Sequence, residues 1–297
     1  MLNHAFLIMT YKDPALLRRV LKLLEADNHF FFIHVDKKTA LAPFQKSCEG
    51  IKNIVLLNDE ERIVTNFFLG GYSQLVTEIL LLRKAYYYKT KMDYFHLISA
   101  ADYPCKRNEE FDKFFEHHNG QSFMLFDSEK ETIEWRKRKY PDRYRMFHFH
   151  DQGYNNNNML NLLKPFIMFL QRYHIYLRRQ ITNVYAGWNW FSWNRKVVEY
   201  ALSQIEEYPN RLERMRYCTC IDEIFFHTML HDVADKLDIV TNNSLRYIDW
   251  HPARPSKTLP LVLDERDYEA IIDSNALFCR KVQPGISDRL IQKLEVI

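Results

Sequence analysis

Hydrophobic positions in the first 127 residues alternate between two periods. Short runs of apolar, β-branched and aromatic residues, typical of buried strands, cover 5–9, 30–35, 54–57, 94–99 and 122–126. Segments with apolar residues at helical spacing lie between them, at 14–24, 74–88 and 109–117. Strands and helices that alternate at this length predict an α/β fold of the Rossmann type, with a mostly parallel sheet flanked by helices.

The pattern changes after residue 127. Residues 130–158 are irregular and rich in Arg, Tyr, His and Asn, which predicts a long loop or an inserted segment. Regular periods then return, and they predict helices over 159–179, 195–205 and 222–231 and from Ser287, with strands over 190–193 and 245–250. No internal repeat is present. The length allows one large domain or two small ones, and we expect a single domain over 1–297, with halves at 1–127 and 128–297.

The predicted sheet also predicts where a ligand binds. Ligands of open parallel sheets lie outside the carboxyl ends of the strands. In this chain those ends are Thr10, Asp36 and the segment 100–106.

Composition and charge remove several classes of function. The seven glycines, at 50, 70, 71, 120, 153, 187 and 285, form neither a G-x-G-x-x-G motif nor a phosphate-binding P-loop. The net charge of +3 is too small to predict a nucleic-acid partner. Lys164 and Pro165 interrupt the longest apolar stretch, 160–170, so we expect no transmembrane segment.

The cysteines and the N-terminus bear on location. Five cysteines without C-x-x-C spacing are typical of free thiols, and the first residues lack the basic segment of a secretory signal. We therefore expect a cytoplasmic protein.

Two adjacent carboxylates, Asp222 and Glu223, precede the apolar run of the predicted helix 222–231. One interpretation is structural, with Asp222 capping the helix and Glu223 complementing its dipole. The other is catalytic: Glu223, beside Phe225 and Phe226, is a general base whose pKa partial burial adjusts. The sequence leaves both open.

A metal site is not predicted. The segment His148-Phe149-His150-Asp151 presents ligand types at alternate positions, but the same period is that of a strand edge. Cys218 and Cys220 lack a second thiol pair, and no Asp-x-Asp occurs. A diphosphate would therefore need basic side chains, for which the candidates are Arg254, Lys257, Arg280 and Lys281.

Two further segments have alternative interpretations. The stretch 187–193 holds three tryptophans, which are typical of a sheet core, although Trp188 and Asn189 would also suit a sugar. The predicted helix 159–179 mixes apolar and basic residues, so it is either a core helix or lies on an anionic membrane surface.

Seven segments together resemble the successive motifs of the core-2/I-branching glycosyltransferase family, which includes the peptide O-xylosyltransferases. In chain order these segments are 5–10, 32–38, 97–104, 187–191, 222–223, 245–250 and 278–281. The resemblance implies a GT-A type fold that transfers a sugar from UDP with inversion and without a metal. It also implies that 1–127 is a nucleotide-binding half and 128–297 an acceptor and catalytic half.

The resemblance assigns roles by motif position. Asp36 resembles the uracil-binding aspartate and Met9 a backbone contact to the nucleoside, while Glu223 resembles the catalytic base. Lys281 resembles a diphosphate-binding lysine, with Arg280 beside it, and for the second cation Lys257 is preferred to Arg254. The residues that we expect on the sugar or acceptor are Asp102, Trp188, Asn189, Asp222 and Trp250.

The donor and acceptor stay open in the sequence. We favour UDP-GlcNAc because the branching enzymes give the family its name, and UDP-xylose is the alternative. The expected acceptor is a glycan or a lipid-linked glycan, which 159–179 would reach at the inner face of the membrane. The other classes considered are a non-catalytic carbohydrate-binding protein and a glycoside hydrolase, whose two carboxylates must flank one bond, unlike adjacent residues.

Overall fold

The fold is described by a computed structural model of residues 1–65, 70–134, 141–149, 151, 158–173, 175, 178 and 181–296. The N-terminal half contains β1 (His4–Thr10), α1 (Pro14–Leu24), β2 (His29–Val35), α2 (Ala42–Cys48), β3 (Ile54–Leu56), α3 (Tyr72–Tyr86), β4 (Tyr94–Ser99), β5 (Tyr103–Pro104), α4 (Asn108–His117) and β6 (Ser122–Phe126). The rest contains α5 (Glu129–Glu134), α6 (Pro141–Arg145), α7 (Asn158–Arg172), β7 (Gly187–Asn194), α8 (Arg195–Glu207), α9 (Pro209–Glu213), α10 (Phe225–Leu230), β8 (Ile239–Val240), β9 (Arg246–Ile248), α11 (Tyr268–Asp273), β10 (Phe278–Arg280) and α12 (Asp288–Leu294).

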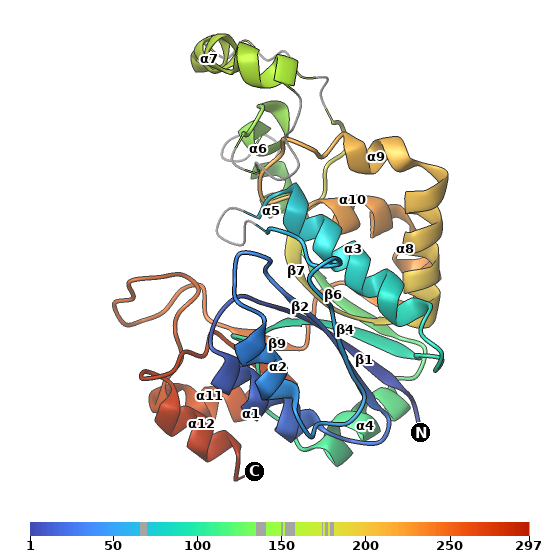
Figure 1. The fold of residues 1–297 in the computed structure, drawn as a ribbon, viewed down its shortest axis with the longest axis vertical. Coiled ribbons are helices and arrows are strands. Elements are labelled where there is room, and N and C mark those ends of the chain that lie inside the picture. The colour runs from blue at the N-terminus through green and yellow to red at the C-terminus, as the bar shows by residue number, and fades with distance from the viewer. Residues whose placement is uncertain are drawn as a thin grey trace.

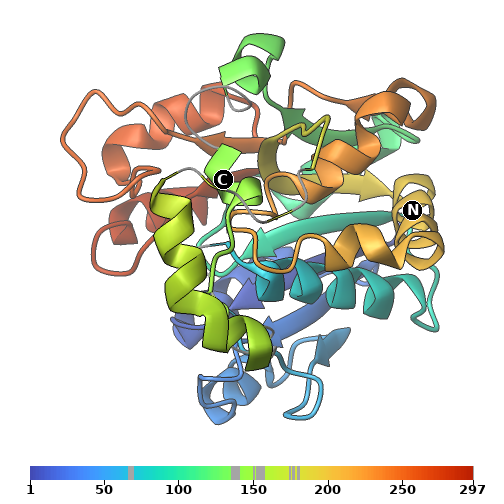
Figure 2. The ribbon, with the colours of Figure 1, turned by 90° about the horizontal axis from the view of Figure 1, so that it is seen from above.

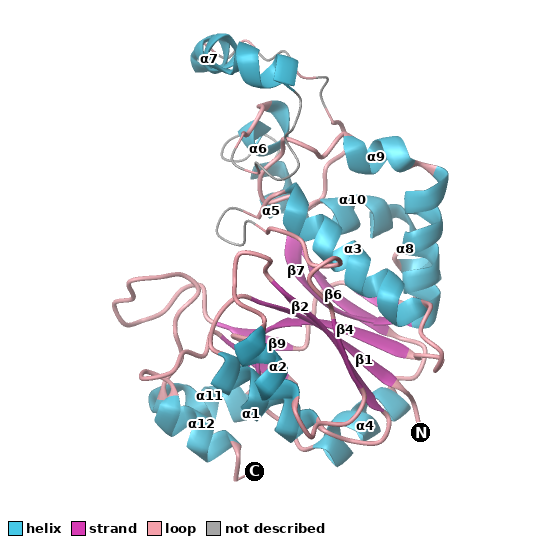
Figure 3. Cartoon of the chain, in the orientation of Figure 1, coloured by secondary structure: helices cyan, strands magenta, loops and turns pink. Residues whose placement is uncertain are grey.

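The main sheet has seven strands in the order β3-β2-β1-β4-β7-β6-β8. Figure 3 shows the strands in magenta between helices in cyan. The pairs β2–β3, β1–β2, β1–β4 and β6–β8 are parallel, whereas β7 runs antiparallel to both β4 and β6. The predicted α/β fold with a mostly parallel sheet is therefore confirmed.

Helices cover both faces of this sheet (Figure 1). On β1, Ala5, Leu7 and Met9 belong to a core that includes residues of α3, α8 and α10. Phe6 and Ile8 point to the other face, whose core includes residues of α1, α2, α4 and α12. A parallel strand covered on both faces needs apolar side chains at every position, which explains the continuous apolar runs of the sequence.

A second sheet of three strands, in the order β5-β10-β9, joins distant parts of the chain. Phe278 pairs with Pro104 and Cys279 with Tyr103, so the end of the chain lies beside the segment that follows β4. This pairing brings Arg280 and Lys281 to the carboxyl-terminal edge of the main sheet. The strand predicted over 245–250 is the shorter β9, and neither β10 nor the helices α2, α9 and α11 were predicted.

Two predicted helices differ from those observed. The helix predicted over 159–179 ends at Arg172, and it lies apart from the main sheet, at the top of Figure 1 and across the molecule in Figure 2. The helix predicted over 222–231 begins only at Phe225, after an N-cap at Ile224. The helix therefore does not start at Asp222, and the structural interpretation of Asp222 as its cap does not hold, because Asp222 and Glu223 lie in the preceding turn.

In the described part of the chain, no helix combines the length and the apolar character that crossing a membrane requires.

Candidate active site

A cleft of about 320 Å³ lies at the carboxyl ends of β1 and β4. This volume falls in the usual range of small-molecule sites, about 300–1,000 Å³. Met9 and Thr10 end β1 on its floor, and Ala100 follows β4, at the sheet edge where the sequence predicts a ligand. The residues predicted for function that line the cleft are Met9, Asn189, Asp222, Glu223, Trp250, Arg280 and Lys281.

Glu223 is held in the cleft by the turn between residues 220 and 224. Its Oε2 accepts a hydrogen bond of 2.9 Å from Nη1 of Arg143 in α6, and its side chain is 35% exposed. Desolvation of the carboxyl group and the nearby charge of Asp222 raise the pKa of Glu223 to about 7, although Arg143 opposes the shift. A carboxylate with this pKa takes up and releases a proton near neutral pH, as a general base must.

A network of buried polar side chains supports the turn from below. Oδ2 of Asp222 accepts hydrogen bonds from Nε2 of Gln74, at 2.8 Å, and from Nδ2 of Asn189, at 3.1 Å. Burial raises the pKa of Asp222 to about 6. Glu78 is fully buried one helical turn after Gln74, and burial, then the charge of Asp222, raise its pKa well above the usual range. The network fixes Asp222 and Asn189 in place, so these two residues orient the turn that holds Glu223.

Gly70 allows this turn to approach α3. Its φ of +56° is left-handed, and a Cβ there would lie 2.7 Å from Oδ1 of Asp222 and 2.9 Å from Cα of Cys220. A larger side chain would push the turn away, because both contacts are far below van der Waals distance.

Cationic side chains also line the cleft. The guanidinium of Arg280 lies 3.7 Å over the ring of Trp190, and its Nη1 donates to both carboxylate oxygens of Asp102, at 3.2 and 3.1 Å. Nζ of Lys281 is 3.4 Å from the carbonyl oxygen of Leu259. Burial, then the charges of Arg280 and Lys12, lower the pKa of Lys281. Two neighbouring cations with this mutual repulsion favour an anionic ligand beside Lys281.

Asp102 and Arg280, which the sequence analysis assigned to the sugar and to UDP, are bonded to each other. Asp102 is fully buried, and its Oδ2 also accepts from the backbone and hydroxyl groups of Ser99. In this geometry Asp102 orients Arg280.

Other predicted residues do not line the cleft. Asp36 is buried at the end of β2, where its carboxylate accepts from the hydroxyl of Thr65, at 2.6 Å, and from the backbone of Lys38, at 2.8 Å. Arg254 forms a two-pronged ion pair with Asp267, one contact of which is 2.7 Å, and Lys257 is exposed. Trp188 is half-buried, with its ring centroid 6.4 Å from that of Trp250.

Among the described residues of the segments considered for a metal in the sequence, no three ligand-type side chains come together. His150 lies outside the described residues. Asp151 accepts a hydrogen bond of 2.6 Å from the backbone of Ser73, at the start of α3, and 146–149 is not in a strand. No disulfide joins the cysteines, all five of which are described.

Four residues of the site were not found from the sequence. Arg143 lies in the irregular segment, where spacing carries no signal. Lys12 follows β1 directly, so its place at a strand end could have marked it. Gln74 and Glu78 are polar residues four positions apart on a helix with a buried face, which is a detectable exception to its apolar pattern.

Comparison with known proteins gives one family. A sequence profile of the family described as Core-2/I-Branching enzyme matches residues 4–272. A xylosyltransferase of Ciona intestinalis is 25% identical over 247 residues, which are 81% of this chain and 26% of that protein. Human xylosyltransferase 2 is 28% identical over 242 residues, or 79% of this chain and 25% of that protein. The chain thus spans about a quarter of the length of these relatives.

Solved structures were also compared. The crystal structure of the galactosyltransferase LgtC with donor and acceptor sugar analogs has a TM-score of 0.42 at 12% identity, covering 99% of this chain and 93% of that one. An active-site mutant of LgtC has a TM-score of 0.44 at 12% identity, covering 99% and 95%.

Proposed function

The chain belongs to the Core-2/I-branching enzyme family, and from that premise we propose that it is an inverting glycosyltransferase with a UDP-sugar as donor. The observation that carries the proposal is Glu223: its carboxyl group lies in the cleft with a pKa raised to about 7 by desolvation, and Lys281 lines the same cleft. A base and a cation around one cleft are what a sugar transfer from a diphosphate requires.

The reaction is a single displacement. Glu223 removes the proton from an acceptor hydroxyl, and the oxygen forms a bond to the anomeric carbon of the donor. The bond from that carbon to the diphosphate breaks on the opposite side, and UDP leaves with the electron pair. Lys281 stabilises the charge that grows on the diphosphate. We assign this role to side chains rather than to a metal ion.

The nucleotide half of the site is assigned by motif position. Asp36 reads the uracil, Met9 contacts the nucleoside and Arg280 supports Lys281. Lys257 stays our second diphosphate cation, ahead of Arg254, whose guanidinium is held by Asp267. Lys12 is an additional candidate because it shares the cleft with Lys281.

Trp250, 36% exposed at the rim, is placed to stack on the acceptor sugar, and Trp188 lies next to it.

GlcNAc is our first choice of transferred sugar, with a glycan as acceptor. Xylose is the second candidate, favoured by the xylosyltransferases of 25 and 28% identity reported above.

Helix α7 favours an acceptor at a membrane surface. Only Ile167 and Gln171 of its described side chains are buried. Ile167 packs in a cluster with Phe149 and Tyr217, and Gln171 accepts a hydrogen bond from the backbone of Phe147. The apolar side chains that it exposes are Met159, Leu162, Leu163, Phe166, Met168 and Phe169. Lys164 and Arg172 are exposed on the same helix, so its charge complements an anionic lipid surface. We place the protein at the cytoplasmic face of a membrane, with a lipid-linked glycan as acceptor.

Nucleotide titration tests the proposal. Calorimetry with UDP, UDP-GlcNAc and UDP-xylose, each in EDTA and in Mn²⁺, should give binding in EDTA, and the tighter UDP-sugar nominates the donor. GDP is the matched control, which should bind weakly because Asp36 reads uracil. Binding that requires Mn²⁺ would contradict the cation assignment. Glycan binding without any UDP binding would move the protein to the non-catalytic class.

A further inference from the structure

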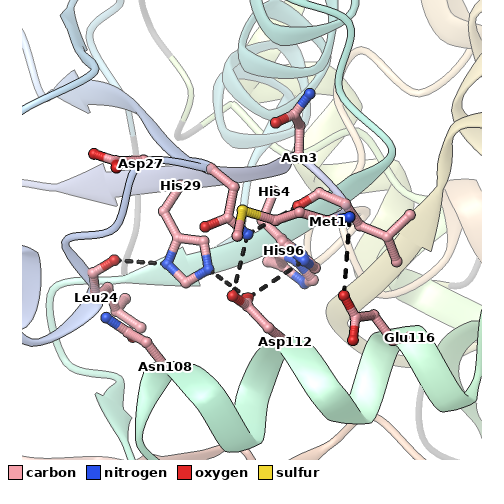
Figure 4. Close-up of polar contacts among 12 residues, drawn as sticks. Met1, Asn3, His4, Leu24, Asp27, His29, His96, Asn108, Asp112 and Glu116 are labelled. Atoms are coloured by element: carbon pink, nitrogen blue, oxygen red, sulfur yellow. Dashed lines mark hydrogen bonds and ion pairs between the residues drawn. The ribbon is translucent and has the colours of Figure 1, made fainter.

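Three ligand-type side chains converge at the amino ends of β1 and β2, on the sheet edge opposite the cleft (Figure 4). His4 and His29 are the first residues of the two strands, and Asp112 lies on α4. Nε2 of His29 is 2.8 Å from Oδ1 of Asp112, and Nε2 of His4 is 3.6 Å from the same oxygen. One ligand atom from each residue lies within 4.8 Å of the other two.

The hydrogen bond behind His29 decides what its ring presents to Asp112. Nδ1 of His29 is 2.6 Å from the carbonyl oxygen of Leu24. A carbonyl oxygen only accepts, so Nδ1 carries the proton, and in the neutral ring Nε2 presents a lone pair. This lone pair faces Oδ1 of Asp112 at 2.8 Å. The nitrogen and the oxygen repel each other at this distance unless a positive charge lies between them.

His4 approaches the same carboxylate from β1. Its Nδ1 is 3.0 Å from Nε2 of His96, whose own Nδ1 is 3.0 Å from the hydroxyl of Ser192. In the tautomer in which Nδ1 of His4 donates to His96, Nε2 of His4 also presents a lone pair toward Asp112. His4 is fully buried, and among the described residues its Nε2 has no hydrogen-bond partner. A buried nitrogen without a partner needs an explanation, and a bound cation supplies one.

We propose that His4 Nε2, His29 Nε2 and Asp112 Oδ1 bind a zinc ion. Two imidazoles and one carboxylate are ligands that zinc prefers, and tetrahedral geometry places its ligand atoms about 3.4 Å apart, within the spread of the trio. The Asp112 side chain is 21% exposed, which leaves room for a water as fourth ligand. The proposed ligands are themselves held by hydrogen bonds. Nδ1 of His29 contacts Leu24, Nδ1 of His4 contacts His96, and Asn28 donates to Oδ2 of Asp112 at 3.2 Å. Hydrogen bonds of this kind orient the ligands of metal sites.

The ion would be structural. It links the starts of β1 and β2 to α4, whereas Met9 in the cleft lies five residues further along β1, on the order of 16 Å away. The sugar transfer proposed above therefore does not involve it.

Metal binding by the full chain, without a histidine tag, tests the site. Protein stripped with EDTA should take up one Zn²⁺ per chain, Co²⁺ should give the visible absorption of a tetrahedral site, and Zn²⁺ should raise the melting temperature. Asp112→Asn should weaken Zn²⁺ binding at least about 10-fold. The matched control is His117→Asn, an exposed histidine on the same helix, which should bind Zn²⁺ like the wild type.

Two results would overturn the site. Equal Zn²⁺ uptake by the wild type and Asp112→Asn would mean adventitious binding elsewhere. No uptake by the wild type, together with a doubly protonated His29 ring in ¹⁵N NMR at neutral pH, would mean that a proton, not a metal, joins His29 to Asp112. The NMR measurement needs no variant, so a folding failure of Asp112→Asn does not prevent the test.

Discussion

The carboxylate of Glu223 is bonded to the guanidinium of Arg143, a residue 80 positions earlier in the chain, at 2.9 Å. Glu223 comes from the turn before α10 and Arg143 from α6, with β7 and α8 between them in the sequence. The pair sets the charge on the proposed base, because Arg143 lowers a pKa that desolvation and Asp222 raise.

Glu223→Gln should abolish the chemistry and keep the nucleotide. Removing a general base costs about 10²-fold or more in rate, whereas the amide keeps the size of the carboxyl group. UDP release from the donor that binds most tightly, with water as acceptor, measures the rate, and calorimetry measures the affinity for UDP. Glu60→Gln, at an exposed position outside the cleft, is the control. Unchanged turnover in Glu223→Gln would remove this residue from the mechanism.

The rate of the wild type should rise with pH to a plateau, with a midpoint near the pKa of Glu223, about 7. Below this pH the base is protonated and inactive. Because the charge of Arg143 lowers this pKa, Arg143→Gln should move the midpoint to higher pH. Rate profiles between pH 5 and 9, on the same donor, compare the two proteins. Superimposable profiles would show that the ion pair does not set the protonation of Glu223.

Lys281→Ala should weaken UDP binding about 10-fold or more, the value of a hydrogen bond to a charged group. The same substitution at Lys257 compares the two proposed diphosphate cations, and a comparable loss would support our choice of second cation. Calorimetry with UDP is the measurement. Equal affinity before and after Lys281→Ala would defeat the assignment of Lys281.

The free energy of unfolding should depend on pH through the buried carboxyl group of Glu78. Its raised pKa means that the folded protein holds a proton which the unfolded chain loses near the ordinary value of 4.5. The contribution of Glu78 to the free energy of unfolding therefore falls as pH rises above that value. Glu78→Gln lacks this proton, so its stability relative to the wild type should rise from pH 5 to pH 8 in urea unfolding. A difference independent of pH would show that Glu78 is not desolvated.

Helix α7 should bind anionic vesicles. Leu162 is 80% exposed and Phe166 58% exposed, so Leu162→Glu with Phe166→Glu should abolish sedimentation with vesicles of anionic lipid at low salt. Tyr87→Glu is the control, since Tyr87 is 66% exposed at the end of α3. Sedimentation that is unchanged in the α7 double variant, or equal with zwitterionic vesicles, would contradict the proposed surface.

Much of the first half of the fold could be predicted from the sequence. Strands such as β1 and β4 are buried on both faces, so their composition alone marks them, and α1 has leucines at helical spacing. Elements such as β10, with three residues, are too short for any period to be visible. Such short elements form through contacts with the folded chain around them, not through a pattern in their own sequence.

The site was predictable where it follows a strand and not where it depends on tertiary packing. Thr10 ends β1, so the rule for parallel sheets finds it, whereas Met9 was assigned by its place in a family motif, and Asp36, which follows β2, does not line the cleft. Asp222 was assigned to a helix start because acidic residues usually cap helices, but Gln74 and Asn189 bind its carboxylate instead. No local pattern in the sequence shows that Asp222 accepts hydrogen bonds from residues 148 and 33 positions away instead of capping the helix.

Because β7 runs antiparallel to β4, the cleft is lined by the ends of β1 and β4 and by the start of β7. Parallel strands contribute their last residues, Met9 and Ser99, whereas β7 contributes its first ones, among them Asn189 and Trp190. The loops before β7 and after β1 or β4 can therefore change length without altering each other's registers. A chimera that exchanges only the loop 181–186 would keep Asn189, which binds Asp222, and Trp190, on which Arg280 stacks, in place.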